Sequence, residues 1–122
     1  GAPAPSGAAS SALSYAQSVL GTPYVYGGAE PGGFDCSGLV MWAFGRAGVG
    51  LPHSAAGQWD DTVRIPYSQA QPGDLVFFYS PVDHVGIYVG NGMMVDALHT
   101  GTVVRYDPIF WNVLDGFGRV EG

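Results

Sequence analysis

The chain has 122 residues, of which 47% are hydrophobic and 13% aromatic, so it can form one domain with a substantial core. Its formal net charge is −6 and its four basic residues are scattered arginines, which argues against nucleic-acid binding and against a polybasic membrane patch. No apolar run approaches the roughly 20 residues of a membrane-spanning helix, and no stretch has the pattern of a signal peptide.

The composition changes near residue 10. Residues 1–9 are rich in Ala, Pro and Ser, which is typical of the end of a linker, and we expect residues 10–122 to form the folded domain. Apolar residues then recur at helical spacing and predict a helix over Ser10–Leu20 that ends at Gly21. The glycines and prolines of residues 21–33 predict a loop.

A second helix is predicted to begin near Cys36. Asp35 precedes it in the N-cap position, and the apolar residues that follow keep helical spacing until Gly48. The segment Pro52–Gln58 is expected to add a short helical turn that Ser54 opens.

The C-terminal half is rich in strand-forming residues. A turn at residues 71–74 precedes it, and the Asn-Gly pair at residues 91–92 predicts a two-residue hairpin. Five strands are predicted, namely Leu75–Tyr79, His84–Val89, Met93–Ala97, Thr102–Tyr106 and Phe117–Val120. Helices followed by an antiparallel meander indicate an α+β fold.

Cys36 is the single cysteine, which excludes an intramolecular disulfide and a multi-cysteine zinc site. Such a residue is either a small buried hydrophobe or a nucleophile. The unpaired N–H groups and the positive dipole end of a first helical turn favour its thiolate. Gly38 leaves room for a substrate backbone, and the run from Asp35 through Ser37 to Gly38 after a glycine-rich loop therefore favours the nucleophile.

A thiol nucleophile needs an imidazole that accepts its proton and later protonates the leaving amine. His84 opens a strongly apolar strand, where a polar residue at the strand end would face a cleft. His53 and His99 are the alternatives. We expect His53 to line the cleft or to cap the short turn, and His99 to be exposed beyond the end of its strand.

The imidazole also needs an orienting group on its second nitrogen. Asp96 is the candidate, because the hairpin at residues 91–92 would place residue 87 opposite Asp96 and so bring Asp96 near the start of the preceding strand. Asp83 is the alternative, but neighbours along a strand point to opposite faces, so it is less suited to His84.

Five ordered motifs within about residues 10–120 resemble the NlpC/P60 family, papain-like cysteine peptidases of bacterial cell walls, and most of all its mycobacterial and actinobacterial endopeptidases. They are YVYGG at residues 24–28, FDCSGLV at 34–40, LPHS at 51–54, QPGDLVFF at 71–78 and HVGIYVGNGMMVDA at 84–97. The resemblance implies N-terminal helices packed on a five- to six-stranded antiparallel sheet. It also implies hydrolysis of the peptide stem of peptidoglycan, typically at the D-γ-glutamyl–meso-diaminopimelate bond, by a monomer secreted to the cell wall.

The resemblance assigns roles position by position. Cys36 matches the nucleophile and His84 the base, while Asp96 stands at the third polar position, where many members have His. Tyr24 matches a tyrosine whose hydroxyl could help to bind the oxyanion. The positions that would hold the substrate are Asp35, Ser37 and His53, although many members have Arg in place of His53.

This chemistry needs no metal or organic cofactor. Two other functions stay open: a non-catalytic peptidoglycan-binding module, and a cysteine amidase that cuts a different cell-wall amide bond. Product analysis distinguishes all three.

Overall fold

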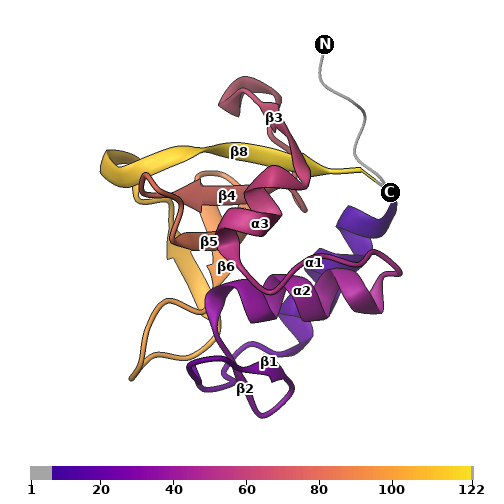
Figure 1. Ribbon diagram of the computed structural model, residues 1–122, viewed down its shortest axis with the longest axis vertical. Helices are drawn as coiled ribbons and strands as arrows, with labels where there is room; N and C mark the ends of the chain where they lie inside the picture. The colour runs from indigo at the N-terminus through magenta and orange to yellow at the C-terminus, as the bar shows by residue number, and fades with distance from the viewer. Residues whose placement is uncertain (1–6, 122) are drawn as a thin grey trace.

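The computed structural model describes residues 7–121 (Figure 1). The helices within this range are α1 (Gly7–Ser18), α2 (Cys36–Arg46), α3 (Ala55–Asp60) and two short 3₁₀ segments, η1 (Tyr67–Gln69) and η2 (Trp111–Val113). The strands are β1 (Ala29–Glu30), β2 (Gly33–Phe34), β3 (Thr62–Ile65), β4 (Leu75–Phe78), β5 (His84–Gly90), β6 (Met93–Asp96), β7 (Arg105–Pro108) and β8 (Leu114–Val120).

The main sheet has six strands in the order β3-β8-β4-β5-β6-β7, and every neighbouring pair is antiparallel. The central strand β4 is buried along its whole length, which explains why Leu75–Phe78 is an uninterrupted apolar run. The predicted α+β fold, with helices followed by an antiparallel sheet, is confirmed.

The α-helices pack on one face of this sheet. Side chains of α1 and α2 form a single apolar cluster with Phe77, Val85 and Ile87 from the strands. Figure 1 shows α1 and α2 side by side, with the β1–β2 hairpin next to them. Because β4 and β5 are central and α2 lies against β5, the start of α2 comes close to the start of β5.

The opposite face of the sheet carries a second apolar cluster and no α-helix among the described residues. Val76, Phe78, Tyr88 and Met94 point to this side, since side chains alternate along each strand. Residues around η1 and η2 cover it, including Phe110, which packs against Phe78 at a ring-centroid distance of 5.4 Å. His84 begins β5 at the edge of this second cluster.

Several boundaries differ from the predictions, three of them near the groove or the chain start. Helix α1 begins at Gly7, because Ala9 is buried against the backbone of Gly73, so the last part of the expected linker is helical; residues 1–6 lie outside the described range. The expected loop at 21–33 contains the small β1–β2 sheet. The strand expected at Thr102–Tyr106 is displaced to Arg105–Pro108.

The displacement of β7 has a tertiary cause. The backbone of residues 102–104 pairs with the segment that follows α1, through Gly21 N–H to the Val104 carbonyl (2.8 Å) and Tyr24 N–H to the Thr102 carbonyl (2.9 Å). These residues are therefore unavailable to β6. The same pairing anchors Tyr24 beside the β6–β7 connection.

A buried ion pair joins β4 to the far end of the chain. Asp74 and Arg119 are 1% and 2% exposed, and the guanidinium donates to both carboxylate oxygens at 2.9 and 2.8 Å. Asp74 also accepts from the N–H of Gln71 at 2.7 Å, which closes the turn before β4. The ion pair therefore fixes the position at which the chain begins β4.

We expect Asp74→Asn to lower the free energy of unfolding by about 3–5 kcal/mol, because it leaves the Arg119 guanidinium buried without its counter-ion. Urea denaturation monitored by tryptophan fluorescence measures this. Asp61→Asn, at an exposed position directly after α3, is the control and should change the same quantity by less than about 0.5 kcal/mol. Equal small effects of both variants would show that the pair contributes little.

Among residues 7–121, no helix combines the length and the hydrophobicity that crossing a bilayer requires.

Candidate active site

Cys36 is the first residue of α2, as predicted. Asp35 is the N-cap and accepts a hydrogen bond from the N–H of Gly38 at 2.6 Å. The Cys36 side chain is partly exposed, and its Sγ lies 4.0 Å from the backbone oxygen of Asp83, next to the start of β5. A cysteine that solvent can reach, beside the free N–H groups of a first helical turn, differs from a structural core cysteine.

The glycine-rich loop packs directly against this helix start. The Gly28 carbonyl accepts from the Asp35 N–H at 2.9 Å, and a Cβ on Gly38 would collide with that same carbonyl. Gly38 is therefore required by the close approach of the two backbones, which positions the residue before Cys36.

Gly38→Ala should lower the free energy of unfolding by about 1–3 kcal/mol and should reduce the alkylation rate of Cys36, because the helix start must move away from Gly28. The reaction of the single cysteine with iodoacetamide reports the second effect. Gly45→Ala, also in α2 but with open space around its Cβ position, is the matched control and should leave the alkylation rate unchanged.

The three residues predicted to hold substrate lie together. Oδ1 of Asp35 is 2.9 Å from Nε2 of His53 and 3.5 Å from the hydroxyl of Ser37, and Oδ2 accepts from the N–H of Gly27 at 3.1 Å. His53 is exposed, whereas Ser37 is only 6% exposed. Asp35 thus already holds the loop, the helix start and His53 in the free protein.

Gln58 supports the groove from behind, a role that the sequence did not predict. It is fully buried, and its Nε2 donates to the carbonyls of Ser37 and Pro52, both at 2.9 Å. It therefore ties the first turn of α2 to the segment that carries His53. The sequence holds no signal for this role, since a glutamine in a short helix is ordinarily exposed.

His84 and Asp96 form a buried pair behind Cys36. Nε2 of His84 lies 2.8 Å from Oδ2 of Asp96, and the two residues are 5% and 0% exposed. The rings of Phe78 and Phe110 flank the imidazole, with centroids 5.5 and 6.4 Å from it. With Nε2 held by Asp96, the ring presents Nδ1 for the interaction with Cys36.

The predicted register of the β5–β6 hairpin is wrong by one residue. Gly90 pairs with Met93 as expected, but a bulge between Tyr88 and Gly90 places Ile87 opposite Val95 rather than Asp96. Without the bulge, Asp96 would share the face of Ile87, away from His84. The extra residue therefore turns Asp96 onto the face of His84.

The electrostatic setting of His84 favours its charged form. Burial alone would lower its pKa, but hydrogen bonds with Asp96 and Cys36 and the negative charges of both groups raise the pKa to about 9. A thiolate at Cys36 and an imidazolium at His84 thus stabilise each other.

Cys36 lies between two hollows of about 280 and 430 Å³. The smaller is lined by Asp35 and Ser37, and the larger by His84 and His99, while Cys36, Tyr24, Tyr26 and Asp83 line both. The cysteine and the imidazole therefore face the same open space. A peptide lying across Cys36 would occupy both hollows.

Tyr24 lies partly exposed in this groove. Burial, followed by the negative charges of Cys36 and Asp35, raises the pKa of its phenol, so it is a neutral hydroxyl donor at neutral pH. Two of the alternatives considered for the pair, Asp83 and His99, also line the groove but do not join the pair. Asp83 is exposed and His84 makes its carboxylate contact with Asp96, while His99 is exposed and bonds through Nδ1 to the Thr100 carbonyl at 2.8 Å.

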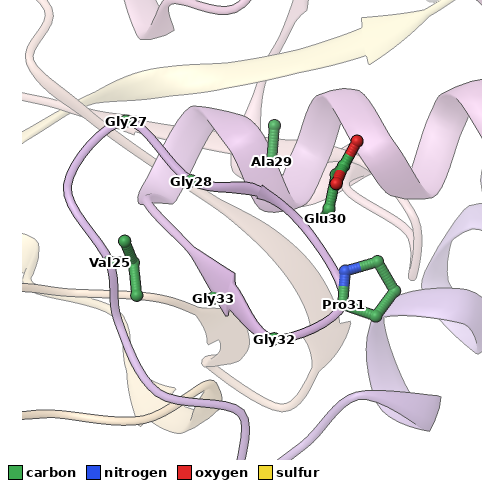
Figure 2. Close-up of a pocket in the computed structure, with 8 residues that line it drawn as sticks. All are labelled: Val25, Gly27, Gly28, Ala29, Glu30, Pro31, Gly32 and Gly33. Carbon is green, nitrogen blue, oxygen red and sulfur yellow. The ribbon is translucent and has the colours of Figure 1, made fainter.

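A third hollow, of about 500 Å³, lies within the loop and does not reach Cys36 (Figure 2). It is lined by residue 25 and residues 27–33, half of which are glycines, and Glu30 is the one charged residue among them. It contains no cysteine and no histidine, whereas the groove at Cys36 contains both. Within residues 7–121 there is also no group of three His, Cys, Asp or Glu side chains placed to hold a metal ion.

Among known protein families, the NlpC/P60 family matches residues 21–114, which is most of the chain. A probable endopeptidase of Mycobacterium tuberculosis is 47% identical over 108 residues, which are 86% of this chain and 28% of the relative. The probable endopeptidase p60 of Listeria monocytogenes is 49% identical over 114 residues, which are 88% of this chain and 23% of the relative. The chain thus spans about a quarter of the length of these relatives.

Solved structures show the same fold. The peptidoglycan hydrolase RipB of Mycobacterium tuberculosis superimposes with a TM-score of 0.82 at 31% identity, covering 100% of this chain and 74% of RipB. A mutated form of the Resuscitation Promoting Factor Interacting protein RipA superimposes with a TM-score of 0.84 at 31% identity, covering 98% of this chain and 70% of the RipA chain. The similar RipA structures include forms mutated at a cysteine, at a histidine and at a glutamate.

Proposed function

Because the chain belongs to the NlpC/P60 family, we propose that it is a cysteine endopeptidase that hydrolyses the peptide stem of peptidoglycan. The observation that carries the proposal is the shared groove, in which Cys36 and His84 face the same open space while Asp96 holds the far side of the imidazole. The order Cys, His, acid along the chain is also the order of the residues mutated in RipA.

In the first half of the reaction, the Cys36 thiolate attacks the carbonyl carbon of the scissile amide. The carbonyl oxygen becomes an oxyanion, which the N–H groups at the start of α2 and the Tyr24 hydroxyl stabilise. The His84 imidazolium then gives its proton to the nitrogen, the C–N bond breaks, and the amine leaves. The product is a thioester on Cys36.

In the second half, a water molecule gives a proton to neutral His84 and attacks the thioester carbonyl. The C–S bond breaks, the carboxylic acid leaves, and the thiolate–imidazolium pair is restored. Asp96 accepts the Nε2–H throughout, which keeps the ring in one tautomer and stabilises the imidazolium.

The charge of the groove supports a substrate with free amino groups. Asp83 lines both hollows, Asp35 lines one, and neither hollow is lined by an arginine. We infer that the stem peptide is bound through Asp35, Ser37 and His53, and that the D-γ-glutamyl–meso-diaminopimelate bond is cut. Such a substrate places the enzyme outside the cell or in the cell wall, where it acts as a secreted monomer.

Digestion of purified muropeptides by the native chain, followed by mass spectrometry, tests this proposal. Release of fragments that end at the D-γ-glutamyl residue supports it. Cleavage between the lactyl group and the peptide, or at a cross-bridge, would assign the chain to the cysteine amidases instead. Binding without any product would identify a non-catalytic module.

A further inference from the structure

The buried carboxylate behind His84 is only half satisfied. Oδ2 of Asp96 is engaged by His84 at 2.8 Å, whereas Oδ1 is buried and has no hydrogen-bond donor among the described residues. A buried carboxylate oxygen without a hydrogen bond lowers the stability of the fold. A group that interacts with Oδ1 is therefore expected beside it.

The paired strand β7 supplies that group. The register places Arg105 directly opposite Asp96, and Asp107 opposite Met94, so both reach the same face of the sheet as Asp96. Asp107 is 9% exposed, and both of its carboxylate oxygens accept from Nε of Arg105 at 3.1 Å. The Asp107 carboxylate therefore interacts with the Asp96 carboxylate, whose Oδ1 has no other partner among the described residues.

Two carboxylates offer only acceptors and repel each other, unless one proton lies between them. We propose that Asp107, held by Arg105, shares a proton with Asp96 and thereby controls when Asp96 becomes the anion that His84 needs. The inference rests on the proposed function in one respect, namely that His84 acts as the base. Asp107 is then a positioning residue, since it reaches the reaction only through Asp96.

The charges that face Asp96 come from two strands. His84 on β5 favours its anion, Asp107 on β7 disfavours it, and Arg105 offsets Asp107; Cys36 lies beyond His84. Burial has the largest effect on the pKa of Asp96 and raises it, and Asp107 raises it further. Together they outweigh the lowering effect of His84, so the pKa of Asp96 rises to about 6. Below this pH Asp96 takes up a proton and loses the charge that supports the imidazolium.

Two variants should move the acid limb of the pH profile of kcat/KM in opposite directions. Asp107→Asn removes the like charge and offers an amide donor to Oδ1 of Asp96, so the limb should move to lower pH by about one unit. At one pH unit below the midpoint of the native acid limb, kcat/KM as a fraction of each protein's own plateau should then be about five-fold higher in Asp107→Asn than in the native chain. Arg105→Gln removes the cation, so the limb should move to higher pH.

Asp61→Asn, which removes an exposed carboxylate outside the site, is the control and should leave the limb in place. KM should change little in all three variants, because none of these side chains lines the groove. An unmoved limb in Asp107→Asn, or movement of both β7 variants in the same direction, would overturn the proposal. A merely structural residue would alter the plateau and the thermal midpoint without moving the limb.

A second measurement needs no turnover. The ring signals of His84 in a proton–nitrogen NMR titration should show an inflection from Asp96 near pH 6, and this inflection should shift down in Asp107→Asn. Assignment among the three histidines uses His53→Gln and His99→Gln. If the inflection shifts but no muropeptide is cleaved, the proposed function fails and proton sharing stands. If cleavage occurs and the inflection stays, proton sharing fails alone.

Discussion

Cys36→Ala should abolish hydrolysis of muropeptides, with a loss of the order of 10⁶-fold in kcat, as is typical when a hydrolase loses its nucleophile. No other cysteine exists in the chain to replace it. The residual rate, if any, reflects binding and the N–H groups of the helix start. Chromatographic quantitation of the released fragments over a long incubation measures the loss.

The thermal midpoint of Cys36→Ala should remain close to that of the native chain, because the side chain is small and partly exposed. Cys36→Ser is the matched variant: it keeps the shape and should be nearly as inactive, since a serine hydroxyl is a far weaker nucleophile than a thiolate. Cleavage by Cys36→Ala at the native rate would exclude a thiol mechanism and with it the proposed function.

Asp96→Asn should lower kcat by about 10⁴-fold, because an amide at this position no longer enforces the tautomer of His84 and supplies no charge to its imidazolium. KM should change little, since Asp96 is fully buried and lines neither hollow. Initial rates over a range of muropeptide concentrations separate the two parameters.

The pH profile gives an independent check on the same pair. With its pKa raised to about 9, His84 stays protonated through neutral pH and loses its proton as the pH rises through 9, so the alkaline limb of activity should lie near pH 9. In Asp96→Asn the carboxylate is gone, and the limb should move toward the ordinary histidine value of about 6.5. A limb that stays near pH 9 in this variant would mean that Asp96 does not support the imidazolium.

The arrangement explains how a small acidic domain brings a cysteine and a histidine to one groove. Asp35 caps the helix of Cys36 and also fixes the glycine loop and His53, so one carboxylate orders both sides of Cys36. The imidazole comes from another layer of the fold, because His84 begins a sheet strand. The relative placement of helix and sheet therefore decides the distance between the Cys36 thiol and the His84 ring.

Local sequence was sufficient for the elements that depend on neighbouring residues. The N-cap Asp35 sets the start of α2 through a bond to Gly38, three residues ahead, and Asn91 and Gly92 adopt the positive φ angles, 55° and 74°, that a tight hairpin turn requires. The short strand β3 was missed, because its four residues pair only with β8 near the other end of the chain. No local pattern encodes such a partner.

The amino-acid sequence by itself determined the helix that carries Cys36, the strand that begins with His84 and the family to which both belong, because each depends on short-range hydrogen bonding or on ordered motifs. Tertiary structure alone decided which acid faces the imidazole. One bulged residue between Tyr88 and Gly90 turns Asp96 to the face of His84, and cross-strand pairing brings Asp107 toward it. Side chains alternate along a strand, so a shift of one residue reverses every contact, and only the packed sheet selects the register.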